Sequence, residues 1–380
     1  IITDTRYEEI KGKTVNAGGI TTGVTSKGGA GGNGTVNIGE IRKGQYYDLK
    51  DIIEQDKETY KESVTIKGDS ILSILNDNNL KTGYYYFVAN GENYPVHLIT
   101  LDGNQHFTGN QTFGDANDVG TATDYAQNMV IVKVNGDLEI DSGVTVAPYY
   151  TQYGGPKGFT LYVTGKLTNK GTIDNSHGAK AEGQNVYLWK NADGTYEYVP
   201  AVGGAKGSGT YSGNGISGVN GTGRQTGGGG ASRNYNGSAG TSYSGGSGAG
   251  SLSSAENNGG SGGKGSGYYN GSGAGNPNGG GTSSSATGGN GTGGLLTIYA
   301  NEYENKGTIS ARGYKGGEVQ PSSTYYIVQG ASSGGGSINI FTLFDITEKG
   351  QINVSGGASS TTGVARGGIG GNGTITYTQL

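Results

Sequence analysis

Tyrosines set among glycine, serine and asparagine are the residues of this sequence best suited to binding chemistry. Tyrosine presents a rigid amphipathic ring at low entropic cost, while the small polar residues around it adapt their hydrogen bonds. An aromatic face also stacks on the C–H groups of a sugar ring. The alternative for each tyrosine is that it anchors a glycine-rich segment onto the rest of the fold. The predicted contact residues are Tyr211, Tyr235, Tyr243, Tyr268, Tyr269, Tyr314, Tyr325 and Tyr326.

Carboxylates supply an enzymatic alternative. A glycan-cleaving enzyme needs two of them converging on one face, roughly 5 to 9 Å apart. Glu302 and Glu304 lie two residues apart and so could share a strand face. The matching segments do not repeat this pair, so we expect these side chains to face solvent. The sequence favours a protein without catalytic residues, with a glycan depolymerase as the less favoured alternative. The other candidates are Asp137, Glu139, Asp141, Asp174 and Asp345.

Metal and cofactor signals are weak. His97, His106 and His177 are isolated from one another, without the spacing of metal ligands. Residues 115–120 resemble the start of a calcium loop, but Val119 and Ala126 stand at two ligand positions of the EF-hand pattern. The chain has no cysteine, which excludes thiol nucleophiles and cysteine-type metal sites. We predict neither a metal site nor a cofactor.

Composition excludes several further classes. The 380 residues include 81 glycines and 27 tyrosines, against 6 phenylalanines and 1 tryptophan. With only 6 prolines and no sustained Gly-X-Y period, the chain is not collagen-like. Charged residues make up 15% and the net charge is -4, which gives no electrostatic footprint for nucleic acid. The sequence contains no run of 18 apolar residues, so it does not predict membrane insertion.

A loose repeat predicts the elements that hold these residues. Each unit has a short apolar strand, a turn in which glycine supplies the backbone angles, and a further strand with alternating inward side chains. The pattern predicts a mainly β fold, with a β-solenoid-like or stacked β-sheet body and long glycine-rich insertions at 174–294, 311–337 and 355–371. The units are 132–134 with 144–146, 161–163 with 169–173, 296–298 with 305–309, and 338–340 with 348–352.

The first third of the chain has a different composition. Apolar spacing predicts a helix at 48–62 and a second short one at 69–80. Residues 84–88 and 96–99 read as two strands joined through Asn90-Gly91, a turn dipeptide. The predicted organisation is an N-terminal β segment at 1–44, a small α+β module at 45–101, a fibre-like connector at 102–128, and the body at 129–380.

The densest glycine stretch, 203–294, has two interpretations. Gly- and Ser-rich segments usually behave as flexible linkers. Large residues interleave with the glycines here, which favours a layer of extended glycine helices with three residues per turn, a polyglycine II layer. Such helices pack closely because glycine has no Cβ to keep backbones apart.

Two six-residue tandem segments carry a resemblance to a known family. Residues 103–108, Gly-Asn-Gln-His-Phe-Thr, are followed by 109–114, Gly-Asn-Gln-Thr-Phe-Gly. This wording resembles linkers of phage tail-fibre proteins, and the glycine-rich composition is similar to that of glycine-rich tail-fibre tip adhesins. The resemblance implies a receptor-binding protein of a virion fibre, a homotrimer that recognises a bacterial surface glycan or surface protein through loops at the ends of glycine runs.

A structural protein is the main alternative to the fibre. The same composition suits an extracellular or cell-surface protein of a bacterium, in which exposed strand edges join subunits into filaments. Ice binding by a flat glycine-helix array fits less well, because the insertions are varied and rich in tyrosine.

Overall fold

The computed structural model divides the chain into two units, Ile1–Lys61 and Glu62–Leu380. In the first unit, β1 (Ile2–Thr3) pairs in parallel with β2 (Gly39–Arg42), which pairs antiparallel with β3 (Gln45–Asp48). The residues described are 2–3, 39–42, 45–48, 62–65, 75–77, 79–89, 92–181, 186–190, 196–199, 203–209, 214–232, 235–250, 274–275, 288–317, 329–346, 348–359 and 366–380.

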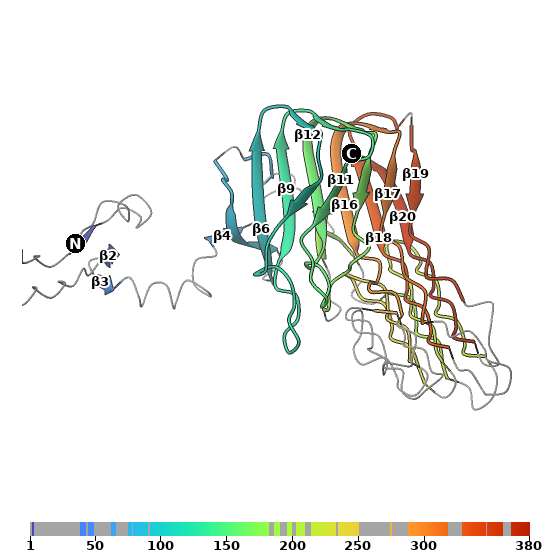
Figure 1. The fold of residues 1–380 in the computed structure, drawn as a ribbon. Helices are drawn as coiled ribbons and strands as arrows, with labels where there is room; N and C mark the ends of the chain where they lie inside the picture. The colour runs from blue at the N-terminus through green and yellow to red at the C-terminus, as the bar shows by residue number, and fades with distance from the viewer. Residues whose placement is uncertain are drawn as a thin grey trace, which may run out of the picture. The chain divides into compact units, whose positions relative to one another are not determined.

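A ten-stranded, mostly parallel sheet organises the second unit (Figure 1). Its main path begins with β20 (Thr374–Gln379), β18 (Ser337–Thr342), β16 (Leu295–Asn305) and β12 (Phe159–Asn169). It continues through β9 (Met129–Asn135), β6 (Glu92–Asp102), β5 (Gly83–Ala89) and β4 (Glu62–Thr65). Two short strands, β7 (Gln105–Phe107) and β10 (Leu138–Ile140), pair off this path.

A shorter parallel sheet follows the same order of units. It runs β19 (Gln351–Asn353), β17 (Thr308–Ser310), β13 (Thr172–Asp174), β11 (Thr145–Pro148) and β8 (Gln111–Phe113). A separate antiparallel pair joins β14 (Val186–Lys190) to β15 (Tyr196–Val199). Each unit of the body therefore contributes one strand to the long sheet and, in most units, one to the short sheet.

The predicted repeat is confirmed by strand register. Leu161 pairs with Ile298, and Ile298 with Ile340, along the long sheet. In the short sheet Ile173 pairs with Ile309. The hairpin predicted through Asn90-Gly91 is also confirmed, as the antiparallel pair β5–β6. Apolar residues of one unit thus lie on apolar residues of the next.

The stacked, mainly β body is confirmed, whereas the β-solenoid prediction was wrong. The two sheets are neither closed nor solenoidal. The physical reason lies in the connections, because long glycine-rich segments leave after β13 and β17 instead of the short turns that would close a coil. The predicted bounds of the insertions stay predictions.

The described residues form no helix of the predicted α+β module. The helix predicted at 48–62 falls on 49–61, outside the described residues. Within the segment predicted at 69–80, Leu75 lies in the core. The boundaries at 45, 102 and 129 stay predictions, and β4, β5, β6 and β9 are neighbours in one sheet. The described residues include no helix with the length and apolar character needed to span a membrane.

Both faces of the long sheet are buried along β9 and β18 and along the first part of β12 and β16, whereas β20 is partly exposed. One face carries an aromatic ladder in register, in which Tyr162 pairs with Tyr299 and Tyr299 with Phe341. The rings of Tyr299 and Phe341 stack with centroids 4.6 Å apart. Lys133 is fully buried beside this ladder, and its ammonium donates to the carbonyl of Asp77 at 3.1 Å. Strands buried on both faces are typical of parallel sheets covered by other elements.

Two buried asparagines link consecutive units. Asn169 and Asn305 pair in register, and neither is exposed. The Nδ2 of Asn169 donates to Oδ1 of Asn305 at 2.8 Å, and Nδ2 of Asn305 donates to the carbonyl of Lys349 at 2.7 Å. Each Oδ1 also accepts the N–H of the turn glycine in its own unit, Gly171 or Gly307. The ladder therefore fixes each turn and its register with the next unit.

We predict that Asn169→Ala lowers the free energy of unfolding by about 1–3 kcal/mol, because it removes the acceptor of the buried Gly171 N–H and one of the hydrogen bonds of Asn305. The matched control is Thr168→Ala on the outward side of the same strand, expected to change stability by less than about 0.5 kcal/mol. Urea denaturation followed by circular dichroism measures both. Equal losses for the two variants would contradict the ladder's role.

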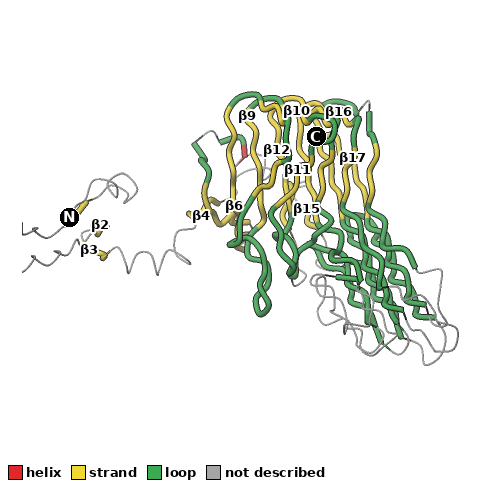
Figure 2. The backbone as a smooth tube through the Cα atoms, viewed as in Figure 1, coloured by secondary structure: helices red, strands yellow, loops and turns green. Residues whose placement is uncertain are grey.

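Glycine-rich segments extend beyond the strands and lie side by side (Figure 2). Gly227 donates its N–H to the carbonyl of Gly335, and Gly230 donates to Ser332, so donors three residues apart reach the same neighbouring segment. Gly228 and Gly229, which lie between these two donors in the sequence, each donate to a different further segment. A β-strand would alternate with a period of two. The described part of the insertion is therefore a hydrogen-bonded layer with a period of three.

The layer has no room for side chains at its contacts. A Cβ built on Gly229 would overlap the carbonyl oxygen of Ser247, whereas a Cβ on Gly109, in the connector, meets nothing within 4 Å. We predict that Gly229→Ala lowers the free energy of unfolding by about 1–3 kcal/mol through overpacking. The matched control, Gly109→Ala, leaves it nearly unchanged.

Limited trypsin digestion tests the same layer near Arg224, through the rate of cleavage after this residue. We expect the wild-type protein and Gly109→Ala to resist cleavage after Arg224, whose side chain bonds to Thr376 and Thr378 of β20. Gly229→Ala should be cut there faster. Rapid cleavage of the wild-type protein at Arg224 would show that the layer does not hold in solution.

Candidate functional site

An aromatic cluster lies where three consecutive units leave the short sheet. Tyr150 follows β11, His177 follows β13 and Tyr314 follows β17. The rings of Tyr150 and His177 are stacked, with centroids 3.7 Å apart and an interplanar angle of 8°. The ring of Tyr314 lies 5.7 Å from His177, and the guanidinium of Arg312 covers Tyr314 at 4.5 Å. The result is a row of aromatic rings with a cation at one end.

Hydrogen bonds between units hold this row in place. The hydroxyl of Ser176 donates to the carboxylate of Asp174 at 2.6 Å and lies 3.0 Å from the hydroxyl of Ser310. It also accepts the N–H of Arg312 at 3.2 Å. The N–H of Gly155 donates to the carbonyl of His177 at 2.7 Å, which ties the loop after Tyr150 to the next unit.

Two glycines make space for Tyr314. A Cβ built on Gly289 or Gly291 would overlap its side chain. The N–H of Tyr314 donates to the hydroxyl of Ser333 at 2.9 Å. The ring therefore rests on the glycine layer, half-buried, while Tyr150 at the other end of the row is 46% exposed.

Burial sets the charge state of the row. It lowers the pKa of His177, and the nearby Asp174 carboxylate only partly offsets this effect. Burial also raises the pKa of the Tyr314 hydroxyl. At neutral pH the His177 imidazole and the Tyr314 phenol are therefore neutral, and Arg312 is the cation of the row. An aromatic surface of this kind can stack on an apolar ligand face, and the guanidinium can donate to oxygen atoms.

We predict that the His177 imidazole titrates below its ordinary pKa of about 6.5. Removing the stacked ring in Tyr150→Ala admits water and should move the pKa upward, whereas Tyr125→Ala, at an exposed tyrosine outside the row, should not. Histidine side-chain NMR during a pH titration measures both. A titration midpoint of His177 unchanged by Tyr150→Ala would contradict the stacking account.

The same shift links His177 to stability. The unfolded chain binds the proton more readily than the folded one, so this group's contribution to stability is complete above about pH 6.5. It is lost as the pH falls through the lower pKa of the folded state. Urea denaturation at pH 7 and pH 5 measures this effect. The free energy of unfolding should fall less between the two pH values in His177→Gln than in the wild-type protein.

The structure places three of the eight predicted tyrosines. Tyr314 belongs to the row just described. Tyr243 is only 4% exposed, its pKa is raised by burial, and its ring lies 5.9 Å from the Lys157 ammonium, which favours its anchoring alternative. Tyr235 is half-buried and exchanges backbone hydrogen bonds with Ser232 as an isolated antiparallel bridge. The other five lie outside the described residues: Tyr211, Tyr268, Tyr269, Tyr325 and Tyr326.

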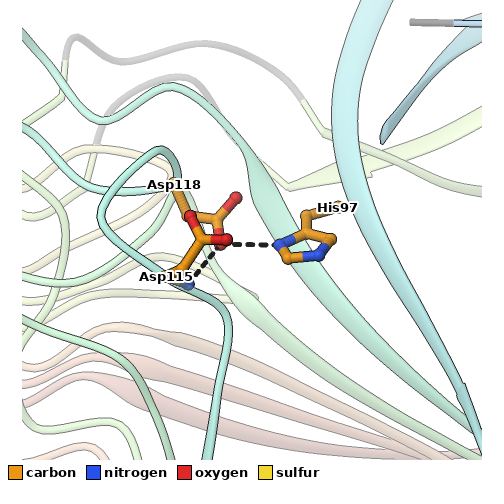
Figure 3. Close-up of side chains that lie close together, drawn as sticks. All are labelled: His97, Asp115 and Asp118. Carbon is orange, nitrogen blue, oxygen red and sulfur yellow. Dashed lines mark hydrogen bonds and ion pairs between the residues drawn. The ribbon is translucent and has the colours of Figure 1, made fainter. Parts of the chain in front are cut away.

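A second cluster gathers around His97 (Figure 3). Ligand atoms of His97, Asp115 and Asp118 lie within 4.8 Å of one another. The Nδ1 of His97 lies 2.8 Å from Oδ2 of Asp118, which also accepts the N–H of Asp115 at 2.8 Å. The ring of Tyr84 stacks on His97 at 4.2 Å, and its hydroxyl donates to Asp115 at 2.9 Å. Among the described residues this is one of two groups that could hold a metal ion, and the other is His106, Glu139 and Asp141.

The cluster's oxygen atoms are already engaged within the protein. The second oxygen of Asp118 accepts Nδ2 of Asn128 at 3.0 Å, and the second oxygen of Asp115 accepts the N–H of Asn117 at 2.7 Å. Asp118 is fully buried. This network folds the 115–128 loop against β6, and we assign it a structural role.

Carboxylates of the body are used in ion pairs. Glu304 pairs with Lys166 at 2.5 Å and with Lys306, and its hydrogen bonds to these lysines lower its pKa to about 2. The hydrogen bond to Lys170 lowers the pKa of Glu139. A general acid requires the opposite shift. Of the predicted pair Glu302 and Glu304, Glu304 therefore has a pKa shift opposite to the one that a general acid requires.

A polar groove accompanies these ion pairs. It encloses about 270 Å³ on the outer side of β7, β10 and β12. His106 lines it and lies 3.0 Å from the carboxylate of Asp141, a bond that raises the histidine pKa. Its lining is Asn104, Gln105, His106, Asp137, Leu138, Glu139, Lys166 and Thr168.

Sequence reasoning missed three members of the aromatic row. Tyr150 and Arg312 were not singled out, and His177 was treated as isolated. The available signal was position relative to the repeat, because all of them follow the second strand of a unit within a few residues. Strand register then brings together residues that lie about 27 and 137 positions apart in sequence.

Comparison with known proteins adds no family to this picture. No family model, no curated protein and no solved structure matches the chain. The resemblance to tail-fibre proteins therefore stays a hypothesis, and the geometry of the aromatic row carries the functional inference.

Proposed function

We propose that this chain is a receptor-binding protein that recognises a glycan on a bacterial surface. The observation that carries the proposal is the row of Tyr150, His177 and Tyr314, with Arg312 at its end. Stacked rings offer flat faces to the C–H groups of sugar rings. The guanidinium offers donors to sugar hydroxyls, or to the carboxylates of acidic sugars, which it binds in bidentate fashion.

The glycine-rich layer supports this proposal as a rigid platform of the polyglycine II type. Its hydrogen bonds repeat every three residues, as in helices with three residues per turn. Arg366 donates its N–H to Asn214, and the N–H of Gly330 donates to Gly317. The flanks of the segments that hold Tyr211, Tyr325 and Tyr326 are therefore bonded into this layer.

We propose that the chain belongs to a tail fibre of a virion. A bacterial surface protein is the alternative to a glycan as its receptor. The tandem segments are part of the described body, because β7 belongs to the long sheet and β8 to the short sheet. A bacterial adhesive or filament-forming surface protein is the second candidate. The exposed edge of β20 is the observation that favours it, and mass measurements address it below.

Adsorption tests the proposal. Fluorescently labelled protein is mixed with a panel of bacterial strains and with arrays of their purified surface glycans, and reducing sugar is assayed in the same tubes. We expect strain-restricted adsorption without release of reducing ends. Tyr150→Ala and Arg312→Ala should each weaken it about tenfold or more, the size of a lost aromatic or charged contact. The matched control, Tyr125→Ala, should adsorb as the wild-type protein does.

Three results would count against the proposal. Adsorption unaffected by both site variants would move recognition away from the aromatic row, and Tyr268→Ala with Tyr269→Ala would then test the loops. Sugar release during adsorption would favour the depolymerase. Adsorption abolished by mild protease treatment of the cells, but not by periodate, would identify a protein receptor instead of a glycan.

A further inference from the structure

The last strand of the long sheet, β20, has an open edge among the residues that the structure describes. Its N–H groups alternate in direction, as in any strand. Thr374 donates to the carbonyl of Gly336, and Leu380 donates to Thr342, on the β18 side. The register between β18 and β20 has no shift. The backbone groups of Ile375, Tyr377 and Gln379 therefore point away from β18, to the open side.

This edge lacks the features that usually prevent strand pairing. Natural edges carry charged residues, proline or bulges. Residues 367–380 contain no Asp, Glu, Lys, Arg or Pro, and β20 pairs along its whole length without a bulge. Arg224 and Lys349 lie near β20, but over its faces: Arg224 bonds to Thr376 and Thr378, and Lys349 covers the Tyr377 ring at 4.3 Å.

Exposed apolar side chains continue along the same border. Of the nine large hydrophobic residues that are exposed in the described part of the chain, seven lie along this border, and Tyr125 and Tyr150 lie elsewhere. Hydrogen bonds connect neighbouring segments to β20 or to the residues before it: the N–H of Gly218 donates to the carbonyl of Ile369, and the side-chain Nε2 of Gln379 donates to the carbonyl of Leu343 at 3.5 Å. The seven residues of this border are Ile216, Val219, Leu343, Phe344, Ile369, Ile375 and Leu380.

We propose that the β20 edge is an interface with a second copy of this chain, paired antiparallel about a two-fold axis. An axis at Tyr377 sets Tyr377 opposite its own copy and Ile375 opposite Gln379 of the partner copy. All of these residues have outward N–H and C=O groups, as hydrogen-bonded antiparallel pairs require. Thr376 then faces Thr378 of the copy, a favourable cross-strand pair.

Self-pairing is the occupant that this edge fits best. The two paired strands carry no charged residue of their own, and the apolar border is covered at the same time. A two-fold contact of this kind is closed, so it produces dimers. It therefore differs from the homotrimer that the fibre resemblance implies. The interface is independent of the aromatic row, so either proposal can fail without the other.

Sedimentation velocity and light scattering of the full chain test the interface. We expect about twice the chain mass of 38.6 kDa at micromolar concentrations. Ile375→Lys, which places like charges across the pair, and Ile375→Pro, which removes an outward N–H, should each return the mass to that of one chain. The matched control, Thr112→Lys on the edge strand β8 of the short sheet, should remain dimeric.

Several outcomes would overturn the interface. These are a monomeric wild-type protein, a trimer, a ladder of growing masses, or a dimer that both Ile375 variants leave intact. Thermal melting shows whether the variants fold. If they do not, hydrogen exchange of the wild-type protein decides: the amides of Ile375, Tyr377 and Gln379 should be protected at high concentration and exchange at least tenfold faster after dilution. Exchange independent of concentration would overturn the proposal.

Discussion

The fold depends on one constraint, which is that each unit must lie in register on the preceding one. In a parallel stack every side chain meets its counterpart at the strand spacing of about 4.8 Å. A position is therefore favoured where the stacked side chains can pack on one another or form hydrogen bonds. Leu161, Ile298 and Ile340 satisfy this requirement as aliphatic neighbours. Asn169 and Asn305 satisfy it with an amide hydrogen bond, which a stack of unlike residues could not make.

Glycine extends the same constraint beyond the sheets. Where the strands end, the segments approach more closely than any Cβ permits, as the overlap at Gly229 and Gly291 shows. Backbone hydrogen bonds replace side-chain packing there, and almost every contact is made by N–H and C=O groups. The high glycine content is thus a packing requirement of the layer. The few large side chains that enter it, such as Tyr243, occupy positions where the layer meets the sheet core.

The sequence predicted the strands more accurately than it predicted whether they close into a coil or which residues form the candidate site. Alternating apolar residues and the glycine-containing turns predicted the strands, because these signals are local. The error over the solenoid arose because a periodic strand pattern does not show whether the connections close a coil. The aromatic row could not be predicted from spacing, since Tyr150, His177 and Tyr314 come together only through register and after insertions of very different length. The His97 and Asp118 pair was missed for the same reason, as the two residues approach through the packing of a loop on β6.

The aromatic row and the β20 edge occupy different units of the stack, and this separation has a functional consequence. The row is built from the units of β11, β13 and β17, whereas the edge belongs to the last strand of the long sheet. Pairing two copies through β20 therefore leaves each row uncovered by the interface itself. A weak single contact with a repetitive surface glycan gains avidity when a second identical site is held nearby, because the second binding event becomes intramolecular. A shallow aromatic surface is the kind of site for which this gain matters most, since it lacks the depth to bury a ligand on its own.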